Sequence, residues 1–214
     1  MIAIIRAQAQ ERKEKLWFDI LERKDVFQKA LADKGHLLYL SQRTKHSDVS
    51  IFIHAIDPNS IGDFIANELT VIPDITGLWI ISLFKPIFYQ LPKDTRDMKR
   101  YVITMKLFPS QLKNIYETLA ASDFPAGVQK SYLAYTFHLF GDCLLLSVLA
   151  EHESQVMKDA SEMLMKIPGV LSVHVNPIEK THPLVSYEDW KTYATKYGIV
   201  QKWNHENMLQ QFHK

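Results

Sequence analysis

The chain has 214 residues, of which 25 are basic and 24 acidic, so its formal charge is only +1. Apolar residues make up 47% and charged residues 23%, which are ordinary globular values and exclude a disordered or fibrous chain. The lack of a basic excess argues against direct binding of nucleic acid. The single cysteine fits a reducing compartment, and no apolar run approaches the roughly 20 residues of a membrane helix. We therefore expect a cytoplasmic protein with no membrane contact.

The first half of the sequence predicts the element order β-α-β-β-α-β. Runs of β-branched and aromatic residues predict strands at 2–7, 36–42, 49–56 and 78–84. One long charged helix is expected within residues 10–34. A second helix begins at Asp57-Pro58, because proline is well tolerated in the first helical turn. Lys45–Asp48 forms a polar turn between the two middle strands.

The second half predicts the same order. Strands are expected at 100–107, 131–138, 143–150 and 170–175, the last of them stopped by Pro177. Pro109 and Ser110 open the first helix of this half. The second helix ends at Pro168-Gly169. Gly141-Asp142 is the turn signal between the two middle strands.

The two halves align with each other, since Ser47-Asp48 corresponds to Gly141-Asp142 and Ile72-Pro73 to Ile167-Pro168. Such an internal repeat predicts an α+β protein of tandem ferredoxin-like βαββαβ units, at residues 1–92 and 98–182. Their antiparallel sheets each leave one face to be covered, and two units can cover each other. Residues 186–214 form a C-terminal helical tail that begins with a capping box of Ser186 and Asp189.

Residues 140–178 resemble the effector domain of the Lrp/AsnC family. Five residues carry the resemblance in order: Gly141, Asp142, Pro168, Gly169 and Val170. The first half matches more loosely, with Ser47 and Asp74 at positions where glycines are expected. Family members pair two units through their sheets as a dimeric α/β barrel, so the resemblance implies that one chain carries both halves. The chain starts with a strand where the family has a helix-turn-helix, so regulation of transcription would require a partner.

The resemblance also implies a ligand site at the two Gly-Asp-like hairpins, where related domains hold small molecules such as amino acids. Exposed turn N–H groups suit a carboxylate, and aspartate suits an ammonium group. The predicted ligand-binding residues are Gly141, Asp142, Ser47, Asp48, Tyr135 and His138. The alternative is that glycine and aspartate stand there simply as good turn formers.

Three functions stay open. The first is a regulatory protein that binds a small metabolite, with a homo-oligomer or another protein as possible partner. The second is a protein-interaction scaffold. The third is an enzyme that uses the barrel interior, monooxygenase-like or haem-associated, with His54, His138 or His174 as the residues to mutate. The sequence has no metal-ligand spacing and no catalytic motif, so no cofactor, metal ligand or catalytic residue is predicted, and a binding role is favoured over a catalytic one.

Overall fold

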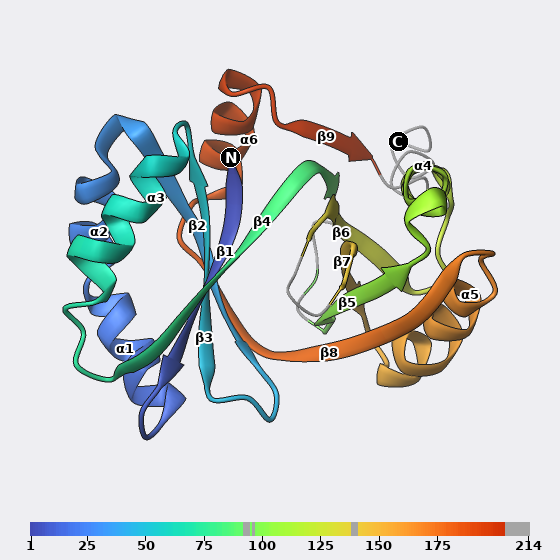
Figure 1. Ribbon diagram of the computed structural model, residues 1–214, viewed down its shortest axis with the longest axis horizontal. Helices are drawn as coiled ribbons and strands as arrows, with labels where there is room; N and C mark the ends of the chain where they lie inside the picture. Colours follow the sequence, from blue (N-terminus) through green and yellow to red (C-terminus); the bar gives the residue numbers. More distant parts are fainter. Residues whose placement is uncertain (92–94, 96, 138–140, 204–214) are drawn as a thin grey trace. The chain divides into compact units, whose positions relative to one another are not determined.

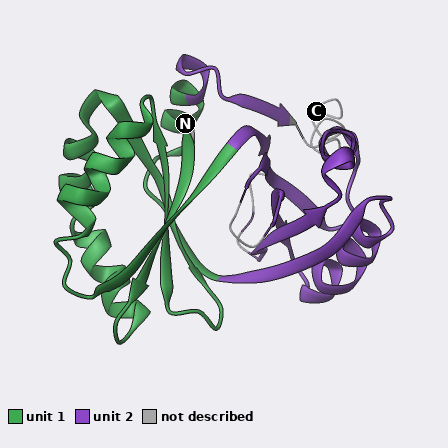
Figure 2. Ribbon diagram, viewed as in Figure 1, with its two compact units in different colours: residues 1–83, 179–193 green, residues 84–178, 194–214 purple. Residues whose placement is uncertain are grey.

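The computed structural model describes residues 1–91, 95, 97–137 and 141–203. The chain divides into two compact units (Figure 2): unit 1 is Met1–Leu83 with Glu179–Tyr193, and unit 2 is Phe84–Ile178 with Ala194–Lys214. The sequence predicted units at 1–92 and 98–182 with a separate tail at 186–214. In the structure the last long strand and the tail are each shared between the two units.

Unit 1 contains strands β1 (Ile2–Ala9), β2 (Gly35–Arg43), β3 (Asp48–Ala55) and the first half of β4 (Ile75–Gln90), with helices α1 (Lys13–Glu22), α2 (Lys24–Leu31) and α3 (Pro58–Phe64). A 3₁₀ turn at Ala32–Lys34 and a π-helical turn at Ile65–Leu69 complete it, together with the start of α6 (Tyr187–Lys196). The strand order is β4-β1-β3-β2. The single helix predicted within 10–34 is wrong, because the chain breaks at Arg23 and forms two helices.

Helices α1, α2 and α3 lie on one side of the unit 1 strands (Figure 1). Alternate residues of β1, namely Ala3, Ile5 and Ala7, pack in one core cluster with Trp17 of α1 and Phe27 of α2. Because side chains alternate along a strand, the intervening residues of β1 lie on the opposite face of the sheet. That face carries the candidate site.

Unit 2 contains β5 (Lys99–Leu107), α4 (Leu112–Ala121), β6 (Val128–Tyr135), β7 (Leu144–Ala150), α5 (Ser161–Met165), most of β8 (Val170–Pro183) and β9 (Val200–Trp203). A 3₁₀ turn at Pro109–Gln111 and a π-helical turn at Gln155–Ala160 precede the two helices. The strand order is β8-β5-β7-β6-β4-β9, and β9 runs parallel to β4. The sequence did not predict β9.

Strands β4 and β8 are longer than predicted, because each of them pairs with strands of both halves of the chain. The first half of β4 pairs with β1 and the second half with β6, so the strand continues past Phe84. Strand β8 pairs with β5 and neighbours β2, and it continues through Pro177. The pairings of β1 to β8 therefore form a closed antiparallel series, as in an α/β barrel, and the predicted α+β class is confirmed.

Candidate active site

The face of the unit 1 sheet opposite its helices is ordered in rows that cross the four strands. Strand pairing sets each row, since Arg6 of β1 is the partner of both Trp79 of β4 and Ser50 of β3. Within each row the residues are named in the strand order β4, β1, β3, β2. Listed from one end of the strands to the other, the rows are Gly77-Gln8-Asp48, Trp79-Arg6-Ser50-Ser41, Ile81-Ile4-Phe52-Tyr39 and Leu83-Ile2-His54-His36. The first two rows are mainly polar, and the third is apolar and aromatic.

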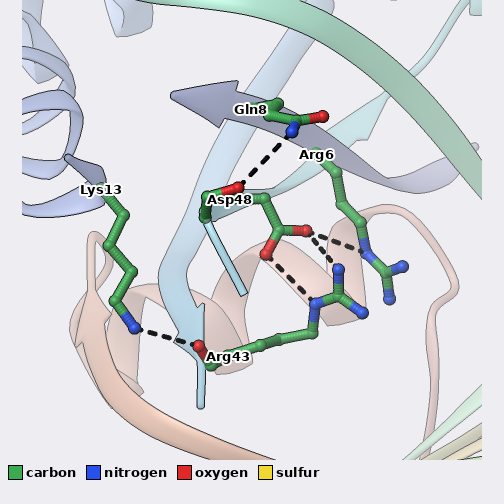
Figure 3. Close-up of polar contacts among 6 residues, drawn as sticks. Arg6, Gln8, Lys13, Arg43 and Asp48 are labelled. Atoms are coloured by element: carbon green, nitrogen blue, oxygen red, sulfur yellow. Dashed lines mark hydrogen bonds and ion pairs between the residues drawn. The ribbon is translucent and has the colours of Figure 1, made fainter. Parts of the chain in front are cut away.

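Asp48 is the centre of a charged cluster at the polar end of this face (Figure 3). Arg43 donates two hydrogen bonds to its carboxylate, from Nε to Oδ1 at 3.2 Å and from Nη2 to Oδ2 at 2.5 Å. The Nε atom of Arg6 lies 4.0 Å from Asp48 Oδ2. The Asp48 side chain is 6% exposed, and the two arginine side chains are about equally shielded, at 16% and 15%. Two guanidinium groups thus converge on one buried carboxylate.

Two further charges adjoin the cluster. Lys13, at the start of α1, donates from Nζ to the Arg43 carbonyl at 3.1 Å and forms an ion pair with Glu179. With Lys13 and Glu179 included, the group has three cations, Arg6, Arg43 and Lys13, and two anions, Asp48 and Glu179. The pKa of His46, in the hairpin turn, is lowered first by burial and then by the charge of Arg43.

Trp79 forms the accessible border of the cluster. Its side chain is 39% exposed, whereas Ile81, two residues further along the same face, is 4% exposed. A Cβ atom placed on Gly77 would lie 3.6 Å from Cη2 of the indole and 3.7 Å from Oε1 of Gln8. The indole therefore lies over the glycine backbone, beside the Gln8 amide and next to Arg6.

A second polar group occupies the far end of the same face. His54 Nδ1 and the Tyr193 hydroxyl are 2.6 Å apart, and the Tyr193 ring makes edge contacts with both His54 and its strand partner His36. Burial, followed by the charge of the N-terminus and of His36, lowers the pKa of His54 to about 4. His54 lies six residue positions after Asp48 on β3, which is roughly 20 Å along a strand. One small substrate cannot contact both groups.

The predicted ligand-binding residues fall in different places. Ser47 and Asp48 lie at the cluster, where Gln8 Nε2 donates to Ser47 Oγ at 3.5 Å. Gly141 and Asp142 belong to unit 2, and Asp142 Oδ1 is buried with no hydrogen-bond partner among the described residues. Tyr135 also belongs to unit 2.

The Tyr135 ring, at the end of β6, stacks on Tyr116 of α4 with the ring centroids 4.1 Å apart, and it packs against the unit 2 core. His138 lies outside the described residues.

Sequence reasoning missed Arg6, Arg43 and Trp79. Arg6 and Gln8 interrupt the apolar run of β1 at every second position, which is the signal of a strand face that carries polar groups. That alternation could have indicated the face. It could not have indicated the partners, because these depend on the pairing of β1 with β3 and β4.

Two cations in unit 2, buried Lys130 and partly buried Arg100, have structural roles. Lys130 donates to the carbonyls of Leu119 at 2.9 Å and Ser122 at 2.7 Å, so it caps the C-terminus of α4. Arg100 donates from Nη1 to the hydroxyls of Ser131 and Ser147, at 2.7 and 3.1 Å. Among the described residues no group of three or more His, Cys, Asp or Glu side chains could hold a metal ion.

No family model matches this chain, and no curated protein matches it significantly. Among solved structures, a "putative monooxygenase" from Fusobacterium nucleatum subsp. nucleatum is 12% identical, with a TM-score of 0.54 over 86% of this chain and 94% of its own. An anthrone oxidase-like protein is 11% identical, with a TM-score of 0.55 over the same shares. A chlorite dismutase variant from Candidatus Nitrospira defluvii is 12% identical, with a TM-score of 0.54 over 84% and 91%. Identities this low show a shared fold.

These comparisons contradict the predicted resemblance to the Lrp/AsnC effector domain, and with it the reading as a metabolite-binding regulator of transcription. The Gly141-Asp142 and Pro168-Gly169 sequences, which carried the resemblance, have local structural causes. Gly141 and Gly169 both adopt positive φ angles, +80° and +98°, which L side chains rarely take. A turn of this geometry recurs in unrelated proteins.

As for membranes, none of the helices in the described part of the chain is both long and apolar enough to span one.

Proposed function

We propose that this chain is an enzyme of the monooxygenase-like type, with its active site at the Asp48 cluster of unit 1. The observation that carries the proposal is the convergence of Arg6 and Arg43 on buried Asp48 beside the exposed indole of Trp79. The fold supports it, since the similar structures bear the names of enzymes that handle oxygen or its compounds. The finer architecture that we propose is a pair of ferredoxin-like units, because β4-β1-β3-β2 and β8-β5-β7-β6 repeat one strand order.

The chemistry expected here starts from a substrate that ionises to an oxyanion, such as an enol or phenol. Guanidinium groups held in a shielded site stabilise a developing oxyanion far better than water does, and one such donor is worth about 10²–10³ in kcat. An enolate of this kind supplies its own electrons to dioxygen. The overall reaction RCH2R′ + O2 → RCOR′ + H2O balances without an external reductant.

Within this reaction the chain's own residues bind and orient the substrate. Arg6 is the residue we assign to the substrate oxygen, because it is the direct cross-strand partner of Trp79, whereas Arg43 is joined to Asp48 by hydrogen bonds of 3.2 and 2.5 Å on the hairpin. Asp48 and Arg43 then hold the site in place. Both arginines are shielded from water, which strengthens their interaction with an anion.

Oxygen uptake tests the proposal. The wild-type protein is mixed with anthrone in an oxygen electrode cell, and chlorite is tested for oxygen release in a parallel run. We expect uptake with anthrone and a loss of about 100-fold in kcat/KM for Arg6→Gln. Arg12→Gln, an exposed arginine of the same unit, should leave the rate unchanged. Equal rates for wild type and Arg6→Gln would contradict the proposal, and a Soret band with oxygen release from chlorite would move the assignment to haem chemistry.

A further inference from the structure

We infer that the substrate of this site is a planar aromatic anion, whose ring stacks on the Trp79 indole while its acidic oxygen contacts Arg6. The inference rests on the proposed function, because it names the substrate class of the same site. It is carried by the juxtaposition of one exposed aromatic platform and one shielded guanidinium on the same row of the sheet face.

The pairing of β1 with β4 sets the distance between the two groups. Arg6 and Trp79 are direct cross-strand partners in an antiparallel pair. The Cβ atoms of such partners lie about 4.5–5.5 Å apart on the same face. A ring resting on the indole therefore has its edge substituents within reach of the guanidinium. A bicyclic aromatic molecule is about the right size to make both contacts at once.

The exposure of Trp79 is unusual for its position on this face. Ile81 and Leu83 follow it on β4 at two-residue intervals and are 4% and 2% exposed, whereas Trp79 is 39% exposed. The indole nevertheless has a defined position, because it lies over Gly77, where a Cβ atom would lie 3.6 Å from the ring. A large aromatic side chain that is positioned yet accessible is suited to stacking with a flat ligand.

The charge of the site selects an anion over a cation. The cluster holds the cations Arg6, Arg43 and Lys13 against the anions Asp48 and Glu179. The planar fork of a guanidinium fits a carboxylate or phenolate oxygen well. An ammonium group placed beside Arg6 would meet a like charge, so amine-bearing ligands are disfavoured.

The next row of the face is apolar and already covered, so it limits the extent of the site along the strands. Ile4 and Ile81 flank each other there on β1 and β4, and Phe52 follows on β3, all of them at most 5% exposed. The Phe52 ring stacks on Tyr39 with their centroids 4.5 Å apart. About 7 Å along the strands from Trp79, the site is therefore bounded by a buried apolar and aromatic row.

Isothermal titration calorimetry with three probes tests the inference without requiring turnover. The probes are 1-hydroxy-2-naphthoate, which is aromatic and anionic, naphthalene-2-methanol, which is aromatic and neutral, and cyclohexanecarboxylate, which is anionic and not aromatic. We expect the naphthoate to bind at least 10-fold more tightly than either of the others. Trp79→Leu and Arg6→Gln should each weaken naphthoate binding at least 10-fold, and Trp79→Phe, which keeps a ring, should weaken it less.

Two control variants and a check of folding complete the test. Phe108→Leu removes another exposed aromatic side chain, and Arg12→Gln removes an exposed arginine of unit 1, so both should bind the naphthoate as wild type does. Thermal unfolding of each variant shows whether it is folded. Equal affinity for the three probes, or unchanged naphthoate binding in folded Trp79→Leu, would overturn the inference. A change of oligomeric state in Trp79→Leu with binding intact would overturn it as well, in favour of a contact between copies of the chain.

The failure of the inference and that of the proposed function give different results. Oxygen uptake with enolisable substrates, together with no preference for the naphthoate, would retain the enzyme and reject the aromatic substrate. Naphthoate binding that depends on Trp79 and Arg6, together with no uptake for any substrate tested, would retain the ligand class and reject the oxygenase.

Discussion

Arg43 and Asp48 stand on the two strands of one hairpin, and two hydrogen bonds of 3.2 and 2.5 Å join the guanidinium to the carboxylate. The pair closes the turn between β2 and β3, and it is shielded from water on both sides. The same contact therefore stabilises the hairpin and fixes the position of the positive charges that we assign to substrate binding. The stability effect and the catalytic effect can be separated by choosing which residue is changed.

Asp48→Ala should lower the free energy of unfolding by about 3 kcal/mol, because it leaves two shielded guanidinium groups without their carboxylate. Urea denaturation measures the change. Lys113→Met is the control, since Lys113 forms an exposed pair with Glu117 at 3.8 Å, whose loss should cost at most about 0.5 kcal/mol. If both variants lose the same small amount, the Asp48 contacts have no special energetic role.

His54 predicts a loss of stability in acid. Burial lowers its pKa to about 4 in the folded protein, whereas the ordinary value of 6.5 applies when the chain is unfolded. Between these two pH values the unfolded chain binds a proton that the folded chain does not, so stability falls as pH falls through this window. The full difference is about 3 kcal/mol.

The measurement compares the free energy of unfolding at pH 7 and pH 4.5 for wild type and His54→Gln. The variant should lack most of this pH-dependent loss, whereas His152→Gln, which changes an exposed histidine, should behave as wild type. Carboxylates also titrate in this range, so the difference between wild type and variant is the informative quantity. Parallel pH profiles for wild type and His54→Gln would show that His54 is not held neutral by burial.

Tyr193→Phe should destabilise the attachment of α6 to the sheet of unit 1 by about 1 kcal/mol, since it removes the hydroxyl bound to His54 and keeps the ring contacts. Hydrogen exchange of the α6 amides would report the loosening directly. A double-mutant cycle with His54→Gln isolates the pair, and a coupling energy near zero would show that the 2.6 Å contact adds nothing.

Local signals in the sequence predicted the elements that are determined locally. Asp57 accepts a hydrogen bond from the Asn59 amide and caps α3, and Ser186 accepts one from the Asp189 amide, both as their motifs indicate. The extension of β4 past Phe84 depends on its pairing with β6 and β9, which no local pattern contains. The same distinction holds for the candidate site. The local turn signal indicated Asp48, but the register of the paired strands decides which residues lie beside it.

Gly169 and Gly62 offer a pair of substitutions with opposite expected signs. Gly169 has a φ of +98°, and a Cβ atom there would lie 2.8 Å from both Cβ and Cγ of Gln111. Gly169→Ala should therefore lower the free energy of unfolding by about 2 kcal/mol, through backbone strain and overlap.

Gly62 lies inside α3 with no atom within 4 Å of its Cβ position. Gly62→Ala should raise the free energy of unfolding by about 0.5–1 kcal/mol, because alanine favours the helix and restricts the unfolded chain. Urea denaturation of both variants tests the pair. A stable Gly169→Ala protein would show that the turn between α5 and β8 does not require glycine, and the steric explanation for the Pro-Gly-Val phrase would then fail.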